Sequence, residues 1–330
     1  MRIFVFCAIV AVLLLESSCG GDDPTPERVN DSQDSLIIRH LDSIGVDYQV
    51  DTTGIYYYPI ELNPTGKSQA DGNVLSVYYS LEVLGGQVLN TYDSADGEPI
   101  RVKQGANAIY PIGVDRSLSF MKEGEEWVFI IPSTYGFEDF NSALIPENSI
   151  LVFQPTLEKI QNETDVQGED NMKIIAYSDS VNLTDTVNYP LNQPEFLTNG
   201  TIFKRLAAGS NPNAPQPQTG DTLTITYTAY LPYHKDEPFD LKHASNANPF
   251  IYNFNTNEVI TGLDAGIANM RQGETALLVM PSLLGYRESA AVFPDYLSEE
   301  MVDRNIIPAY ASDVGPYEVL IFEVSLLQIN

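Results

Sequence analysis

Few side chains in this sequence could act as nucleophiles or as metal ligands. The 330 residues include three histidines, His40, His234 and His243, and two cysteines. That supply is too small for a Cys/His zinc site, and no local motif marks a Ser-His-Asp triad. The sequence therefore predicts chemistry that needs neither a metal nor a cofactor.

Acidic residues dominate the charge of the chain. Asp and Glu number 45 against 17 Lys and Arg, a formal net charge of −28. Such a chain repels phosphate backbones, which excludes a nucleic-acid-binding function. Asp170, Asp179 and Asp185 suggest calcium, but no D-x-D-x-D-G loop surrounds them, so we interpret them as a solvated acidic face.

The one cysteine with a clear chemistry is Cys19. It follows Ile3–Leu15, an apolar run of thirteen residues, and the small residues Ser17 and Ser18 come directly before it. The run has the length of a signal-peptide core and is too short to span a bilayer. The pattern resembles a bacterial lipobox and predicts a signal peptide over residues 1–18 and acylation of Cys19, which would anchor the chain in the membrane. An ordinary secretory signal with a chance cysteine is the alternative.

A polar tether, residues 19–33, follows the anchor. Its Asp22 and Asp23 resemble the surface-export signal of Bacteroidota lipoproteins, although a solvated spacer has the same composition. We therefore expect the protein to be anchored to the bacterial outer membrane, either on its periplasmic face or on the cell surface.

The rest of the chain contains a duplication. Gly72–Leu81 matches Gly220–Ala229, Met121–Glu125 matches Met270–Glu274, and Ile150–Phe153 matches Val319–Phe322 after about twenty extra residues. Several blocks in one order indicate two domains, 34–161 and 170–330, each able to fold by itself, with a linker over 162–169.

Each copy has a mixed α+β pattern. Alternating apolar positions over Val74–Tyr79 and Leu223–Tyr227 predict half-buried strands. Leu263, Ile267 and Met270 share one face of a short helix. An amphipathic helix before the strands completes an α+β domain.

The second copy contains a series of short motifs in a fixed order. They are Thr224–Tyr227, Phe239-Asp240, Pro249-Phe250, Val259–Gly262, Met270–Glu274, Met280-Pro281, Ile306–Pro308 and Ile321–Val324. In this order and spacing they resemble the motifs of the FKBP-type peptidyl-prolyl cis-trans isomerases. The resemblance implies a curled antiparallel sheet around one short helix in each copy, with an aromatic pocket between helix and sheet.

The resemblance also implies the site residues of the second copy. Leu263 stands where many family members have a tryptophan at the floor of the pocket, and Ile307 fits the apolar lid over it. Tyr286 follows Gly285, whereas the family's tyrosine precedes the glycine, so its phenol would come one position later in the chain. Taken singly, each aromatic could be ordinary core and Asp240 a turn former. The set is Tyr227, Phe239, Asp240, Phe250, Val259, Ile260, Leu263, Tyr286, Ile307 and Phe322.

The first copy matches the family less well. Leu89-Asn90 stands where Phe-Asp is expected, and Pro111 takes the place of the residue whose backbone N–H would receive the substrate carbonyl. Proline has no such donor. We predict a retained fold with an eroded pocket, made of Tyr79, Leu89, Asn90, Tyr135, Ile145 and Phe153.

The implied function is isomerisation of X–Pro bonds in polypeptides of the bacterial envelope, mainly by the second domain. Rotation about such a bond breaks amide resonance without making or cutting a bond, so an apolar slot with a few donors suffices. The alternative is a non-catalytic envelope protein that uses the same fold to bind a partner.

Acylation of Cys19 gives the first testable prediction. Cys19→Ala should release the protein from the membrane fraction and abolish its labelling by radioactive palmitate, because the thiol is the site of attachment. Unchanged labelling and fractionation in that variant would contradict the lipobox interpretation.

Overall fold

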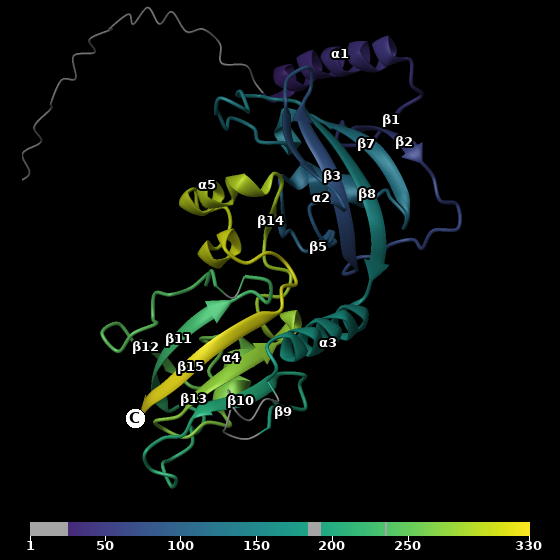
Figure 1. The fold of residues 1–330 in the computed structure, drawn as a ribbon. Coiled ribbons are helices and arrows are strands. Elements are labelled where there is room, and N and C mark those ends of the chain that lie inside the picture. The colour runs from purple at the N-terminus through teal and green to yellow at the C-terminus, as the bar shows by residue number, and fades with distance from the viewer. Residues whose placement is uncertain (1–25, 184–192, 235) are drawn as a thin grey trace, which may run out of the picture.

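The structure, a computed structural model, describes residues 26–183, 193–234 and 236–330. These residues form two domains, with helix α3 (Glu163–Ser180) at their junction (Figure 1). Cys7, Cys19 and Asp185 lie outside the described residues, as does the first part of the expected tether. Within the described ranges, no helix combines the length and apolarity needed to cross a membrane.

Domain 1 is a seven-stranded antiparallel sheet curled around the short helix α2. The strand order is β1-β2-β7-β8-β3-β4, and β5 also pairs with β3. Helix α1 covers the other face of the sheet through Ile37 and Leu41. The elements are α1 (Pro26–Ile44), β1 (Gln49–Val50), β2 (Tyr56–Glu61), β3 (Val74–Val83), β4 (Val88–Tyr92), β5 (Ile100–Lys103), β6 (Ile109–Tyr110), α2 (Ile112–Leu118), β7 (Glu125–Ile131), the 3-10 turn η1 (Ser133–Tyr135) and β8 (Leu151–Gln161).

Domain 2 repeats this plan with six strands in the order β12-β11-β15-β13-β10-β9. Its short helix is α4, and α3 packs on its outer face as α1 does in domain 1. The tandem α+β fold expected from the sequence is confirmed. The elements are β9 (Glu195–Phe196), β10 (Ile202–Ala207), β11 (Thr222–Tyr230), β12 (Phe250–Asn253), α4 (Thr261–Ile267), β13 (Thr275–Met280), η2 (Ser282–Leu284), β14 (Ala291–Val292), η3 (Asp295–Leu297), α5 (Ser298–Asp303), η4 (Ala309–Ser312) and β15 (Leu320–Ile329).

A glycine near the start of each short helix lets that helix lie against the next strand. A Cβ on Gly113 would come 2.4 Å from Cγ2 of Ile131, and a Cβ on Gly262 would come 2.4 Å from Sδ of Met280. Both distances are far inside van der Waals contact, so any larger residue would push the helix off its sheet. The repeated glycine thus sets the depth of the space between helix and sheet.

The expected linker, residues 162–169, is helical. Asn162 caps α3: its side chain accepts a hydrogen bond from the Asp165 N–H at 3.0 Å, and the Asp165 carboxylate accepts one from the Asn162 N–H at 3.0 Å. This capping box stabilises a helix start in a polar stretch that composition alone assigns to a linker. The expected tether, 19–33, also ends in helix, because α1 begins at Pro26.

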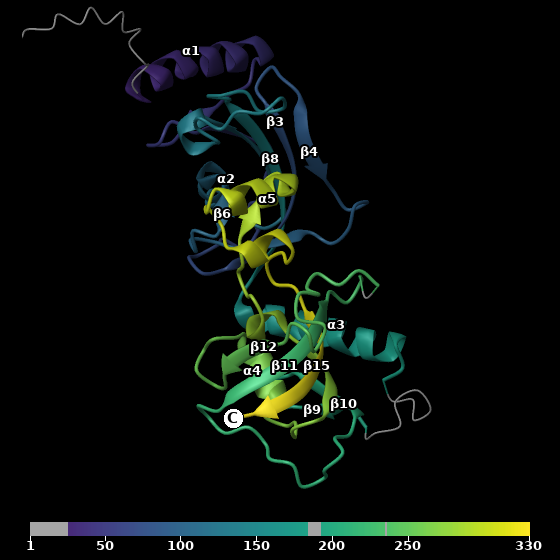
Figure 2. The same cartoon turned by 90° about the vertical axis from the view of Figure 1, so that its left-hand side faces the viewer.

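The extra residues of domain 2 form an excursion that we call the insert, residues 285–319. The corresponding connection in domain 1, between η1 and β8, has 15 residues (136–150), whereas the insert has 35. Figure 2 shows its helix α5 lying against domain 1. Eight insert residues belong to the core of domain 1, so the expectation of two separately folding copies needs correction: Ala290, Ala291, Val292, Phe293, Leu297, Met301, Ile307 and Ala311.

A buried carboxylate joins the two domains. Asp170 of α3 is fully buried, and its Oδ1 lies 3.3 Å from the Arg101 guanidinium of domain 1. Its Oδ2 accepts hydrogen bonds from the Ser282 N–H at 2.8 Å and the Ser282 hydroxyl at 2.5 Å. Arg101 also donates to the Tyr317 carbonyl oxygen at 2.6 Å. The interpretation of Asp170 as part of a solvated face is wrong, since partners from both domains compensate its charge.

Removing this carboxylate should destabilise the protein strongly. Asp170→Ala leaves Arg101 buried without its counter-charge, which costs about 3–5 kcal/mol of unfolding free energy. The matched control is Glu169→Ala, because Glu169 pairs with the exposed Lys159, a type of contact worth about 0–1 kcal/mol. Urea denaturation of both variants measures the difference. Equal midpoints would contradict the role given to Asp170.

Candidate active site

Four aromatic rings of domain 2 meet on the hollow side of its sheet. The Tyr227 ring of β11 lies 5.5 Å from Phe322 of β15 and 6.0 Å from Phe250 of β12, measured between centroids. Phe239 meets Phe322 edge-on at 6.3 Å. Period-2 alternation places these side chains on one face, because the strands that carry three of them are hydrogen-bonded neighbours.

A carboxylate fixes the orientation of the Tyr227 phenol. The phenol donates a hydrogen bond to Oδ2 of Asp240 at 2.7 Å, and Oδ1 of Asp240 accepts one from the Lys242 N–H at 2.9 Å. Burial, and then Asp240 as acceptor and as negative charge, raise the pKa of Tyr227 well above its usual value. The phenol is therefore a neutral donor held in one position.

The residue before α4, Ile260, lines the hollow. Ile260 caps this helix with extended backbone angles, φ −61° and ψ 142°. Among the described residues, no protein group accepts a hydrogen bond from the Ile260 N–H. Helix α4 is fixed to β12 by the Tyr252 phenol, which donates to Asp264 at 3.0 Å. Leu263, one turn along the helix, is buried at the floor.

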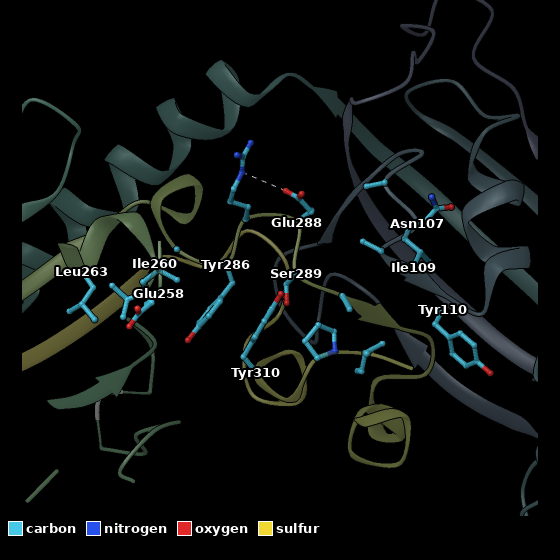
Figure 3. A pocket seen from close by; sticks show the side chains of 18 of the residues that line it. Asn107, Ile109, Tyr110, Glu258, Ile260, Leu263, Tyr286, Glu288, Ser289 and Tyr310 are labelled. Carbon is cyan, nitrogen blue, oxygen red and sulfur yellow. Dashed lines mark ion pairs between the residues drawn. The ribbon is translucent and has the colours of Figure 1, made fainter. Parts of the chain in front are cut away.

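Two stacked tyrosines form a further wall. The rings of Tyr286 and Tyr310 lie 4.4 Å apart and are tilted by only 10° (Figure 3). Burial, followed by the charge of Asp240, raises the pKa of Tyr286. The turn Pro281–Gly285 repeats Pro132–Gly136, which puts Leu284 at the place of Tyr135, so Tyr286 stands two positions late rather than one.

These parts enclose one cavity of about 780 Å³, which we call the slot. Phe239 and Asp240 support its walls from behind, through Phe322 and Tyr227. Sequence reasoning missed Tyr310 and the domain 1 segment 106–110 that faces the slot (Figure 3). Pro308 also lines the slot; it belongs to the matching block Ile306–Pro308, of which only Ile307 was expected at the site. Eight of the residues expected at the site line the slot: Tyr227, Phe250, Val259, Ile260, Leu263, Tyr286, Ile307 and Phe322.

Comparison with known proteins decides the family. The family model of the FKBP-type peptidyl-prolyl cis-trans isomerases matches residues 66–158 and 214–327, one region in each domain. This chain belongs to that family. The two matched regions confirm the tandem pair of FKBP domains expected from the repeat.

Individual relatives match one domain's length of the chain. FK506-binding protein 1 of Kluyveromyces lactis is 33% identical over 136 residues, which cover 41% of this chain and 98% of the relative. Mouse peptidyl-prolyl cis-trans isomerase FKBP2 is 40% identical over 111 residues, 34% of this chain and 64% of the relative. Among solved structures, the three FKBP domains of wheat FKBP73 align over 86% of this chain and 99% of that one, at 18% identity and a TM-score of 0.32.

The corresponding FKBP pocket of domain 1 is filled. Tyr79 and Phe153 lie 6.1 Å apart at a tilt of 46°, close to the 5.5 Å and 45° of Tyr227 and Phe322. Phe293 of the insert meets both rings edge-on, Tyr79 at 4.8 Å and Phe153 at 6.0 Å. Phe293 is fully buried there, so the space that is open in domain 2 is occupied in domain 1.

The polar groups of the first pocket also differ. Asn90 donates to the Tyr79 phenol oxygen at 2.8 Å, at the place where Asp240 accepts from Tyr227. Pro111 caps α2 as Ile260 caps α4, so this helix start offers no N–H to a substrate. Leu89 and Ile145 are buried core residues, whereas Tyr135 lies under the Arg116 guanidinium, 5.0 Å from its ring centroid.

The hydrogen bond between Tyr227 and Asp240 can be tested by titration. Because the folded-state pKa of Tyr227 lies above the unfolded value of about 10, the neutral phenol stabilises the fold fully below pH 10, and this stabilisation is lost as the pH rises through the folded-state pKa. The tyrosinate absorbance of the wild type minus that of Tyr227→Phe should therefore show a step above pH 10. In an Asp240→Asn background the step should move down toward 10. A step that stays in place would contradict the coupling.

Proposed function

We propose that this protein catalyses cis-trans isomerisation of X–Pro bonds in polypeptides and that the slot of domain 2 is the active site. The observation that carries the proposal is that three aromatic rings, Ile260 and Tyr286 line one cavity large enough for a proline and its neighbours. Family membership supports the same reaction class.

The slot would act by holding the amide away from water. Twisting an X–Pro bond costs about 18–20 kcal/mol in the absence of a catalyst, because amide resonance stabilises the planar form. That planar form is the more polar one, so an apolar cavity disfavours it relative to the twisted form. Tyr227, Phe250 and Phe322 would supply the apolar surface, and Leu263 the floor.

Two fixed donors would orient the substrate. The Ile260 N–H would bind the carbonyl oxygen beside the proline, which fixes the bond that rotates. The Tyr286 phenol is neutral at neutral pH, and burial raises its pKa further; it would face the twisted amide as a second donor. Asp240 acts through Tyr227, whose ring it holds in place, since both carboxylate oxygens already accept hydrogen bonds.

Domain 1 would contribute little catalysis of its own. Its pocket contains Phe293, its helix start has Pro111 in place of a donor, and Asn90 replaces the carboxylate. A substrate proline would have to displace a fully buried phenylalanine to enter. Activity is therefore assigned to domain 2.

The anchor predicted from the sequence suggests the place of action. With Cys19 acylated, the tether would hold both domains at the bacterial envelope, where newly exported polypeptides with X–Pro bonds are the available substrates. The apolar run Ile3–Leu15 and the position of Cys19 support this assignment to the envelope.

The isomerase assignment can be tested with the full chain in a protease-coupled tetrapeptide assay. Phe250→Ala removes an apolar side chain whose burial contributes about 1.5–3 kcal/mol. If this whole contribution stabilises the transition state, kcat/KM should fall about ten- to hundredfold. Asp240→Ala should cost about tenfold by freeing the Tyr227 ring.

Asp221→Ala is the matched control, because this carboxylate of domain 2 also accepts a backbone hydrogen bond, from the Gln218 N–H, but lies outside the slot. Equal losses in all three variants, or a wild type without activity, would overturn the catalytic assignment and favour a binding protein.

A further inference from the structure

We infer that the pocket of domain 1 has become the receptor for the insert, and that this docking holds Ile306–Tyr310 in place as one wall of the domain 2 slot. Phe293 is then a positioning residue for a site that it does not touch. The inference deepens the proposed function and rests on it for its catalytic part. We call Ile306–Tyr310 the wall segment.

The insert pairs with domain 1 in a separate two-stranded sheet. β14 pairs in parallel with β6, with the Ala291 N–H donating to the Ala108 carbonyl at 2.8 Å and the Phe293 N–H donating to the Tyr110 carbonyl at 2.8 Å. This is the way an extended peptide binds to an exposed strand, with main-chain hydrogen bonds for affinity and a pocket for a side chain. The pocket is the one between Tyr79 and Phe153, and Phe293 fills it.

Docking continues along the rest of the insert. Leu297, Met301, Ile307 and Ala311 are all buried in the core of domain 1. The N–H groups of Ile306 and Ile307 both point to the Met301 carbonyl oxygen, at 2.9 and 3.4 Å, which ties the wall segment to the end of α5. The wall segment thus takes its position from side chains anchored in domain 1.

The other side of the wall segment faces domain 2. Ile306, Pro308 and Tyr310 line the slot, and Tyr310 stacks on Tyr286. Tyr310 lies between Ile307 and Ala311 in the sequence, and both of these are buried in domain 1. The wall is therefore made by a segment that is anchored on one domain and used by the other.

The two ends of the insert are tied to each other, so its middle depends on docking for its shape. The Ser289 hydroxyl donates to the Val314 carbonyl at 3.0 Å, and the Tyr317 N–H donates to the Arg287 carbonyl at 2.7 Å, which closes the base of the excursion. Between them α5 has only six residues and η4 four. Helices this short do not persist without tertiary contacts. Removal of the anchor should leave the wall segment mobile while the base stays closed.

The test uses the full chain with Phe293→Ala. Its matched control is Phe129→Ala, which removes an equally buried phenylalanine from the same core but contacts Tyr57, Phe120 and Trp127 instead of the insert. Amide hydrogen exchange over residues 306–312 should rise at least about tenfold in Phe293→Ala and stay within about twofold in Phe129→Ala.

Tetrapeptide kinetics form the second measurement. Phe293→Ala should raise KM about tenfold and change kcat by less than about threefold, because a loosened wall weakens binding more than it alters the donors at the reacting amide. Phe293→Leu, which refills most of the pocket, should recover most of this loss. If Phe293→Ala acted only by destabilising domain 1, it would not raise KM selectively over kcat. The control Phe129→Ala, which destabilises the same core, would then change the kinetics as much as Phe293→Ala does.

Each outcome is decisive. Unchanged exchange over 306–312 in Phe293→Ala overturns the docking inference whatever the activity, and increased exchange with unchanged KM overturns the link to the slot. A wild type without isomerase activity refutes the proposed function. The hydrogen-exchange measurement does not depend on activity, so it tests the docking of the insert in either case. If Phe293→Ala does not fold, Ala291→Pro removes the strand hydrogen bond to Ala108 without emptying the pocket, and the same readouts apply.

Discussion

The Asp170 carboxylate lies where helix α3, domain 1 and the turn that contains Ser282 meet. The position of the two domains relative to each other depends on this buried charge. An isolated buried carboxylate costs several kcal/mol, and this one is compensated only because Arg101 of domain 1 and Ser282 of domain 2 both reach it. The turn that contains Ser282 leads directly into Tyr286 and the insert. The charge that fixes α3 at the junction therefore also sets where the insert begins.

The two domains contain pockets of the same design, and only the pocket of domain 1 holds a side chain of the insert. The Tyr79 and Phe153 pair keeps nearly the geometry of Tyr227 and Phe322, so the scaffold of the first pocket is intact. What changed is the occupant and the polar groups: Phe293 fills the space, and Pro111 removes the donor. A pocket that no longer has to admit substrate can bind part of its own chain permanently.

Much of this organisation could be predicted from the sequence, because it is carried by local patterns. The repeat, the α+β fold and the family follow from strand alternation and from motifs such as Val259–Gly262, and most of the slot residues come from those motifs. The helix start at Asn162 was predictable in principle, since Asn-x-x-Asp is a capping pattern, but composition suggested a linker.

Docking of the insert could not be predicted in that way. Its buried positions, among them Phe293, Met301 and Ile307, match a surface contributed by residues some 200 positions earlier, and no local pattern identifies that surface. The same holds for Tyr310, whose partner Tyr286 is defined only once the insert is folded. Long-range complementarity of this kind leaves no local signal.

The sharing of one core between the two ends of the chain has a consequence for biosynthesis. The last strand of domain 1 ends at Gln161, whereas its Phe293 arrives more than 130 residues later. At about 5–20 residues per second, a ribosome needs on the order of 10 s for that interval. During this time the nascent domain has an open aromatic pocket and an unpaired strand β6. The core of domain 1 is therefore completed only when residues 290–311 of the chain have been synthesised.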